Sequence, residues 1–379
     1  MGSPRTPTRI GLALLLAAGL GAAWGQTPSY LSGIRRHRLL TSTTPDNGDT
    51  NPYAVVVAPV SAGDLVKGDV LVDNFNAFTN FQGTGSTIVR FRPGDHSLAL
   101  FAKLPALPQC PGGIGLTTAM TMLESGWILV GSAPSQRGST ATKGPSAIFV
   151  LDPRGQLAAV WTGPEIDGPW GNIAVLDQGD RATLFITMAG SGLGSPKDID
   201  PRTGLPPVLH NGTVLRLELR IPAGQPPVRV AQTVIADGLA QRADQAKFLL
   251  GPTGLALGAD HTLYISDGVE NCLRAVGDAL TRSTSAGPGR IVTRDGLLNR
   301  PLAMAMAPNG HLLVCNGCNG QVVEVDPGNG QQVAAQWLDS NQAQTPPGNG
   351  DLFGLALALD GQGFYYVQDD TNLLLYAGR

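Results

Sequence analysis

A repeated supersecondary unit constrains the fold more than any other feature of this sequence. Each unit opens with a short apolar strand, passes through a turn that contains Gly or Asp, and continues in a second strand that ends in Asp or Asn. The clearest copies open at residues 252–257, 301–306 and 353–358. Units of this kind cannot bury their apolar faces alone, so they stack on one another to form a continuous core.

Looser copies precede these three, opening at residues 52–57, 115–122 and 170–176. The copies follow one another at steps of about 50 to 80 residues, and a propeller blade with its loops needs roughly 50. The strands carry apolar residues on both sides, which suits sheets that are buried on both faces. The sequence therefore predicts an all-β fold, a six-bladed β-propeller of four-stranded antiparallel blades.

The last unit ends close to the C-terminus, at residues 372–376, and has no room for a fourth strand. We expect a segment within residues 30–42 to supply that strand and close the ring, which removes two open sheet edges. Residues 190–211 are rich in Gly, Pro and Asp and are predicted to form a surface insertion. A seven-bladed ring is the alternative, with a degenerate unit hidden in residues 205–250.

Composition excludes several other classes of protein. The 379 residues include 50 Gly and 29 Pro, which break long helices. The formal net charge is −3, whereas a nucleic-acid-binding protein needs a basic surface. We therefore expect no nucleic-acid partner.

The N-terminus has the layout of a secretory signal peptide. Arg5 and Arg9 precede an apolar run at residues 10–23, and small residues stand at Ala23 and Gly25. Residues 1–25 are therefore predicted to be removed, leaving an N-terminal segment at 26–50 with the ring-closing strand and a propeller at 51–379. The apolar run is shorter than the ~20 residues that span a bilayer. We expect a secreted or periplasmic protein with no membrane span after cleavage.

The repeats also resemble a known family. Proline or glycine stands at the opening of each clear unit, next to apolar residues, and the fourth unit continues as Tyr264-Ile265-Ser266-Asp267, with Asn271 following. This pattern resembles NHL-repeat propellers and the gluconolactonase/SMP-30-like six-bladed group over about residues 51–376. The resemblance implies the architecture, while its members include enzymes, scaffolds and ligand binders.

Polar and aromatic residues follow the second strands or link the blades, which places them on one face of a propeller. We predict a ligand-binding face that comprises Asp73, Asn76, Trp170, Asn172, Asn316, Asp369 and Asn372. A structural role is the alternative, because Asp and Asn often end strands by bonding to the backbone of their own loops.

The resemblance also implies a metal site, made by a Glu of the first blade, an Asn after Pro in a later blade, and a further Asn and Asp. The first blade instead opens Asn51-Pro52-Tyr53, and Thr253 follows Pro252. Only Asp267 matches, so the candidate metal ligands are Asp267 and Glu270, with Ca²⁺ as the divalent cation.

These departures favour a non-catalytic module that binds a protein or small-molecule ligand through its loop face. The alternative is a divergent metal-dependent lactonase or other hydrolase of the gluconolactonase-like group. The five histidines are spread over separate strands and loops, which argues against a lyase with a His-bound zinc.

The chain has four cysteines, and two of them, Cys315 and Cys318, have C-x-x-C spacing. Because an extracytoplasmic protein can keep disulfides, we expect Cys318 to pair with Cys315 or with Cys272. A redox or copper site and simple buried thiols are the alternatives.

Overall fold

The computed structural model describes residues 1–2 and 27–379. The predicted signal peptide lies outside the described residues apart from its first two. In the described part of the chain, no helix is long and apolar enough to cross a membrane.

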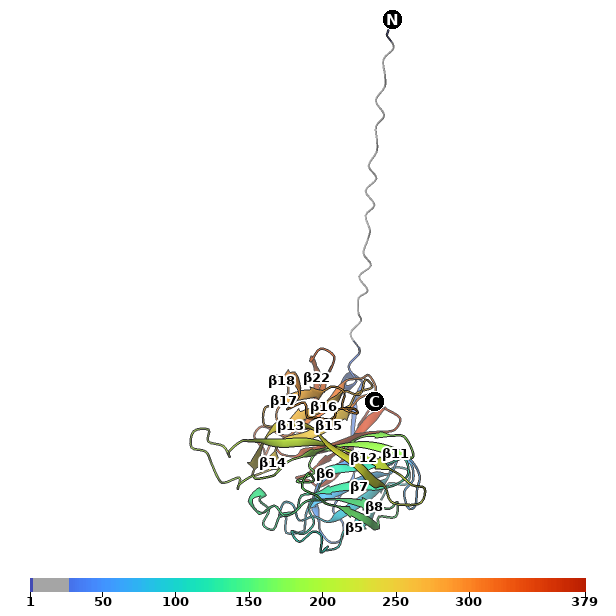
Figure 1. Cartoon of the computed structure of the whole chain (residues 1–379), viewed down its shortest axis with the longest axis vertical. Coiled ribbons are helices and arrows are strands. Elements are labelled where there is room, and N and C mark those ends of the chain that lie inside the picture. The colour runs from blue at the N-terminus through green and yellow to red at the C-terminus, as the bar shows by residue number, and fades with distance from the viewer. Residues whose placement is uncertain (3–26) are drawn as a thin grey trace.

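Six antiparallel sheets follow one another along the chain and pack around a common centre (Figure 1). We number them as blades I to VI. Blade I contains β2 (Thr50–Val57), β3 (Val70–Asn76), β4 (Thr87–Arg92) and β5 (Ser97–Lys103). Blade II contains β6 (Leu116–Met122), β7 (Ile128–Ser132), β8 (Ala147–Leu151) and β9 (Leu157–Trp161). Blade III contains β10 (Ala174–Asp177), β11 (Arg181–Met188), β12 (Leu209–Arg220), β13 (Val228–Asp244) and the short β14 (Phe248–Leu250).

The remaining blades repeat the same order of strands. Blade IV contains β15 (Pro252–Leu257), β16 (Leu263–Asp267), β17 (Cys272–Val276) and β18 (Arg290–Arg294). Blade V contains β19 (Pro301–Met306), β20 (Leu312–Asn316), β21 (Gln321–Val325) and β22 (Gln332–Trp337). Blade VI contains β23 (Leu352–Leu357), β24 (Gly363–Gln368), β25 (Leu373–Gly378) and β1 (Arg36–Ser42). Two short 3₁₀ turns, η1 (Leu31–Gly33) and η2 (Thr140–Thr142), complete the described elements.

The core lies between the blades. Middle strands such as β7 and β8 are buried along their whole length, whereas the outermost strand β22 alternates between half-buried and exposed positions. Leu71 and Ile88 of blade I pack in one cluster with Met120 and Ile128 of blade II. Apolar side chains on both faces of a strand are therefore buried by different neighbours, as the repeat predicted.

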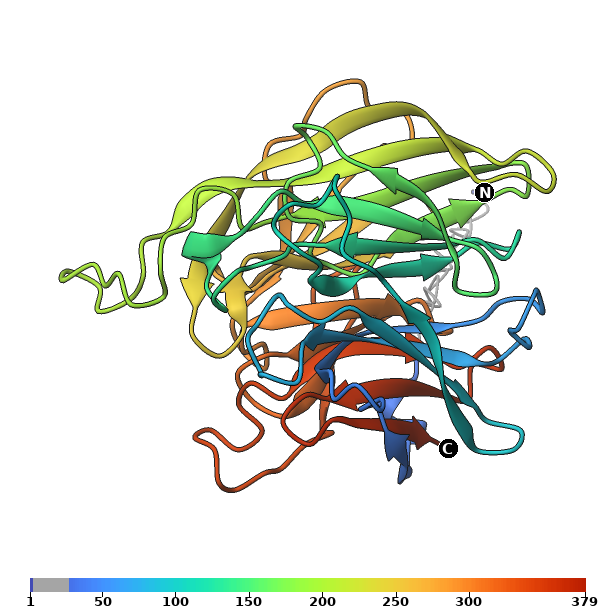
Figure 2. The same cartoon turned by 90° about the horizontal axis from the view of Figure 1, so that it is seen from below.

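The prediction of six blades is confirmed and the seven-bladed alternative is wrong. Residues 205–250 form β12, β13 and β14, which extend the same sheet as β10 and β11. Residues 190–208 of the predicted insertion lie between β11 and β12 and project from the ring as a long yellow-green loop, whereas residues 209–211 begin β12 (Figures 1 and 2).

An N-terminal strand closes the ring, as predicted. β1 pairs antiparallel with β25, from Arg36 opposite Gly378 to Ser42 opposite Leu373. In Figure 2 the blue β1 lies beside the red C-terminal strand. This pairing joins the two ends of the propeller by backbone hydrogen bonds and leaves no gap between blades VI and I.

A buried carboxylate on blade V holds the segment that leads into β1. Glu324 is fully buried and accepts hydrogen bonds from Ser29 Oγ at 2.6 Å, Tyr30 N at 2.8 Å and Leu31 N at 2.9 Å. His311 Nδ1 lies 2.7 Å from the same side chain. Burial alone would raise the pKa of Glu324, but these hydrogen bonds outweigh it and hold the pKa below its ordinary value of 4.5.

We expect Glu324→Gln to lower the free energy of unfolding by about 3 kcal/mol, because hydrogen bonds to a charged group are lost and the buried donors keep poorer partners. Since the pKa of Glu324 is lower in the folded state, its stabilisation is present above its ordinary pKa of 4.5 and is lost on acidification. Urea unfolding at pH 7 and pH 4 measures both effects. Glu124→Gln, at an exposed carboxylate that takes part in none of the ion pairs of the described residues, serves as the control. An unchanged free energy for Glu324→Gln would contradict the anchoring role.

Candidate functional site

A polar cleft of about 660 Å³ opens on the face built by the loops that join second to third strands. The β3–β4, β7–β8 and β24–β25 loops contribute to it, together with the β13–β14 turn and the link from β22 to β23. We call it the loop-face cleft. Its polar and aromatic lining comprises Thr50, Asn51, Asn76, Asn80, Phe81, Gln82, Arg137, Gln245, Gln344, Asn349, Asp351, Asp369, Asp370 and Asn372.

Three residues of the predicted ligand-binding face line this cleft, namely Asn76, Asp369 and Asn372. Asn51 brings blades VI and I together, because its backbone N–H donates to Asn372 Oδ1 at 2.7 Å and its Nδ2 donates to Asp369 Oδ2 at 3.0 Å. Burial raises the pKa of Asp369 well above its ordinary value, and repulsion from Asp351 and Asp370 adds to the effect.

Asp73 and Asn316 are fully buried and bond to the backbone around them. Asp73 Oδ1 accepts from Ala54 N at 2.8 Å, and Asn316 bonds to Asn299 N and Leu297 O, each at 2.9 Å. The structural alternative accounts for the contacts of both side chains. Burial also raises the pKa of Asp73 to about 8.

Asn172 lies deeper, in the wall of the central channel. Its Nδ2 donates to Leu255 O at 2.7 Å, and its Oδ1 accepts from Leu255 N at 3.1 Å and from Met304 N at 3.3 Å. The side chain thus ties blade III to blades IV and V. The structure does not bring Asn172 into the loop-face cleft.

Aromatic side chains fill the ring where the innermost strands begin. Tyr53 stacks between Phe75, with ring centroids 4.4 Å apart, and Phe353, with centroids 4.0 Å apart. Trp170 meets Tyr53 edge-on and stacks on Phe248 at 5.7 Å. All five rings are buried, so Trp170 belongs to a core rather than to an open face. We call this group the aromatic plug.

The residues in and near the aromatic plug can be compared with the ligands that the resemblance implies for a metal site. Blade I opens Asn51-Pro52-Tyr53 with no Glu, and the ring of Tyr53 is buried there. In blade IV, Thr253 follows Pro252 and donates its hydroxyl to Gly251 O. Stacked rings and a hydroxyl that is already bonded cannot replace carboxylate and amide ligands for a hard cation. The residues present therefore do not fit a divalent metal at this position.

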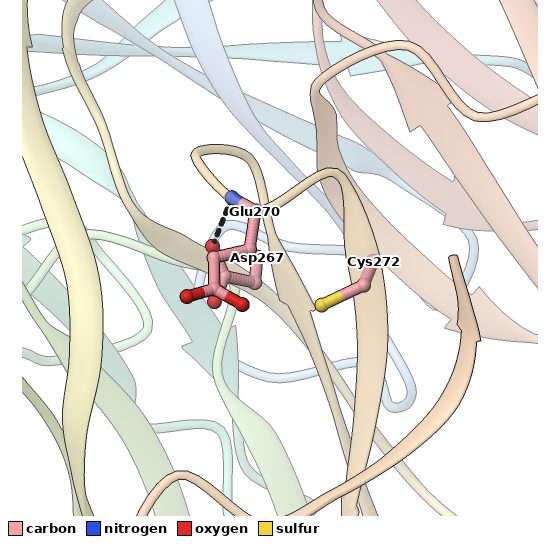
Figure 3. Close-up of side chains that lie close together, drawn as sticks. All are labelled: Asp267, Glu270 and Cys272. Atoms are coloured by element: carbon pink, nitrogen blue, oxygen red, sulfur yellow. Dashed lines mark hydrogen bonds between the residues drawn. The ribbon is translucent and has the colours of Figure 1, made fainter. Parts of the chain in front are cut away.

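Asp267 and Glu270 lie together beside Cys272, as Figure 3 shows. Asp267 Oδ2 accepts from Arg274 Nε at 3.1 Å, and Glu270 Oε2 accepts from Arg274 and Arg294, each at 2.8 Å. Two guanidinium groups thus compensate both carboxylates. A cation would have to displace these arginines, so the geometry favours an ion-pair network over the predicted metal site.

A second carboxylate group combines Asp339, Asp351 and Asp370, with one oxygen from each within 4.8 Å of the others. Asp339 and Asp351 were not among the predicted site residues, because they lie in the blade V–VI link outside the repeated strands. The usable signal was the run of oxygen-bearing side chains at residues 339–351. Burial, with repulsion from Asp370 and Asp339, raises the pKa of Asp351 to about 7.

The predicted disulfide is not formed, and all four cysteines are free thiols. Cys315 lies within β20 and packs in the apolar cluster with Val322 and Leu355. Cys318 lies in the following turn, and Cys272 begins β17 in another blade. Burial raises the pKa of Cys315 to about 12 and that of Cys272 to about 11, which agrees with inert buried thiols rather than a redox pair.

We expect the free energy of unfolding of the Asp73→Asn variant to increase relative to that of the unsubstituted protein as the pH rises. Because the pKa of Asp73 is raised from 3.8 to about 8, the folded state holds a proton that the unfolded state releases, so its contribution to stability falls between these pH values. The slope is at most about 1.4 kcal/mol per pH unit.

Urea unfolding at pH 5 and pH 8 measures this difference. The exposed Asp46→Asn provides the control. An equal stability difference between Asp73→Asn and the unsubstituted protein at both pH values would show that Asp73 does not hold a proton.

No family model matches the chain, and the comparison with curated proteins found no match. Solved structures do match. A gluconolactonase from Xanthomonas campestris aligns with a TM-score of 0.54 and 17% identity, covering 92% of this chain and 91% of that one. A luciferin-regenerating enzyme aligns with a TM-score of 0.56 and 11% identity, covering 92% and 96%.

A PQQ-bound aldose sugar dehydrogenase from Streptomyces coelicolor has a TM-score of 0.52 and 16% identity, with coverage of 90% and 98%. At these identities the likeness concerns the fold alone. The chain is a six-bladed β-propeller whose structural neighbours include gluconolactonase-like proteins.

Proposed function

We propose that this protein binds a small, neutral, polyhydroxylated ligand of the sugar or sugar-lactone class in the loop-face cleft. The observation that carries the proposal is the gathering of amide side chains from several blades around one cavity of about 660 Å³. Such a volume lies within the usual range of about 300 to 1,000 Å³ for small-molecule sites.

The chemistry of the lining matches hydroxyl groups. Asn and Gln side chains each offer a donor and an acceptor, and so does every hydroxyl of a sugar. The ring of Phe81 is 52% exposed at the edge of the cleft, where its face can pack on the C–H groups of a pyranose. The lining has three carboxyl groups and one guanidinium, which disfavours an anionic ligand. The concave shape favours a small molecule over a protein partner.

The β3–β4 loop supplies both amide side chains and the exposed aromatic ring to the lining of the cleft. Asn76 Nδ2 donates to Asn80 Oδ1 at 2.8 Å, which fixes the start of the loop. Gln82 Nε2 reaches across to Ala246 O at 2.8 Å on the β13–β14 turn. These hydrogen bonds hold the chain on both sides of Phe81. Phe81 therefore stays at the cleft edge without the ligand, and less conformational entropy is lost on binding.

We further propose that the protein acts outside the cytoplasm, which the predicted signal peptide supports. Cleavage before Gln26 would leave intact the segment that contacts the ring, because Pro28 O accepts from Asn309 and Ser29 bonds to Glu324. N-terminal sequencing of the protein produced in a secreting host is expected to read from Gln26. A chain that still begins at Met1 would contradict this proposal.

We expect Phe81→Ala to weaken sugar binding by at least about tenfold, which corresponds to about 1.4 kcal/mol, because the stacking surface is removed. Isothermal titration calorimetry with D-glucose, D-galactose and glucono-1,5-lactone measures the affinity. Phe78→Ala is the matched control, because Phe78 is 75% exposed in the same loop and does not line the cleft.

Two results would overturn the proposed function. Absence of saturable heat with every probe at millimolar concentration would remove the binding role for this ligand class. Acid release from glucono-1,5-lactone in a pH-stat, lost in Asp369→Asn, would replace it with the alternative, a lactone hydrolase whose carboxyl group lies in the same cleft.

A further inference from the structure

Three carboxylates converge where blade VI meets the preceding link. Asp339 and Asp351 lie at the two ends of the link between β22 and β23, and Asp370 follows β24. One carboxylate oxygen from each lies within 4.8 Å of the others. Asp339 and Asp351 are buried, while Asp370 is exposed at the wall of the loop-face cleft.

The donors to these carboxylates are amide groups, and Asp339 and Asp351 also interact with each other. Asn341 N donates to Asp339 Oδ1 at 2.8 Å, and Asn341 Nδ2 donates to Asp370 Oδ2 at 2.9 Å. Gln344 Nε2 donates to Asp351 Oδ1 at 2.6 Å. The ten salt bridges among the described residues include none of these three carboxylates, in contrast to Asp267 and Glu270.

An independent observation concerns the oxygens that face this group. Asp351 is only 2% exposed, and its Oδ2 is buried without a hydrogen-bond partner. Gln344 Oε1, on the side chain that contacts Asp351, is likewise buried without a donor. Buried acceptors nearly always find a partner, and leaving one without a partner destabilises the folded state. A bound cation would satisfy Asp351 Oδ2 and the surplus negative charge of the group.

We propose that Asp339, Asp351 and Asp370 bind a hard divalent cation, with Ca²⁺ preferred. The ligands are oxygens, and a link outside the regular strands supplies two of them, which suits the variable coordination of Ca²⁺ better than the strict octahedron of Mg²⁺. The group contains no His or Cys, which zinc prefers. This site lies apart from the aromatic plug, where the residues exclude a cation. It does not depend on the proposed sugar ligand.

Binding would join the two ends of the β22–β23 link to the β24–β25 loop. Without the ion, the three carboxylates repel one another and only amide hydrogen bonds hold the link. With the ion, the link and the loop share one set of ligands. We therefore expect Ca²⁺ to raise the melting temperature and to protect the 338–351 segment from proteolysis.

The test uses the mature protein after treatment with EDTA and dialysis. Calorimetric titration with CaCl₂ is expected to show one saturable site, with weaker binding of MgCl₂. Asp370→Asn should weaken Ca²⁺ binding at least tenfold. The same substitution should raise the melting temperature of the metal-free protein, because it removes one of three repelling charges. This opposite change in the two states separates a cation site from a purely structural cluster.

Glu270→Gln is the matched control, because it alters the other carboxylate group and should leave Ca²⁺ affinity unchanged. Circular dichroism confirms that both variants are folded. Absence of a Ca²⁺ heat at millimolar concentration would overturn the proposal. So would unchanged affinity in Asp370→Asn, or loss of binding in Glu270→Gln, which would assign the ion to Asp267 and Glu270.

Discussion

The pairing of β1 with β25 is the interaction on which the rest of the molecule depends. A propeller blade buries both faces only when it has a neighbour on each side, so an unclosed ring would expose the faces of its first and last blades. Here residues from both ends of the chain share one sheet, and Glu324 holds the segment that leads into it. The buried carboxylate of Glu324 therefore holds the short N-terminal segment in a fixed position, and this segment leads into blade VI.

Closure also creates the candidate site. Asn51 begins blade I and Asp369 belongs to blade VI, more than 300 residues later, yet their side chains are hydrogen-bonded because the ring brings these blades together. The β3–β4, β7–β8 and β24–β25 loops that line the cleft each leave a strand that is buried along all or most of its length. The cleft is therefore a product of the ring as a whole, and no single blade contains enough of its lining to form it.

The repeat allowed the architecture to be predicted from the sequence, because repeated units of apolar strands and Asp- or Asn-ended turns bury their apolar faces by stacking on one another in a ring. The same regularity made the residues of the site difficult to identify from the sequence. Asn316 ends its strand at the repeated position and Asp73 lies within β3, and both bond to backbone. Asp351 instead lies in a link that has no counterpart in the repeat. C-x-x-C spacing suggested a disulfide, but strand geometry directs Cys315 into the core between blades. Spacing does not reveal that direction.

The aromatic plug explains why polar chemistry lies away from the ring axis. Tyr53, Phe75 and Phe353 stack where the innermost strands begin, and burial of such rings stabilises the fold by excluding water from the axis. A cation or polyol placed there would lose its hydration without gaining ligands. Amides and carboxylates are instead available in the surrounding loops, at the β3–β4 loop and at the blade V–VI link. None of the plug residues lines the loop-face cleft, so substitutions on the loops can alter recognition while the packed rings and the closed ring remain unchanged.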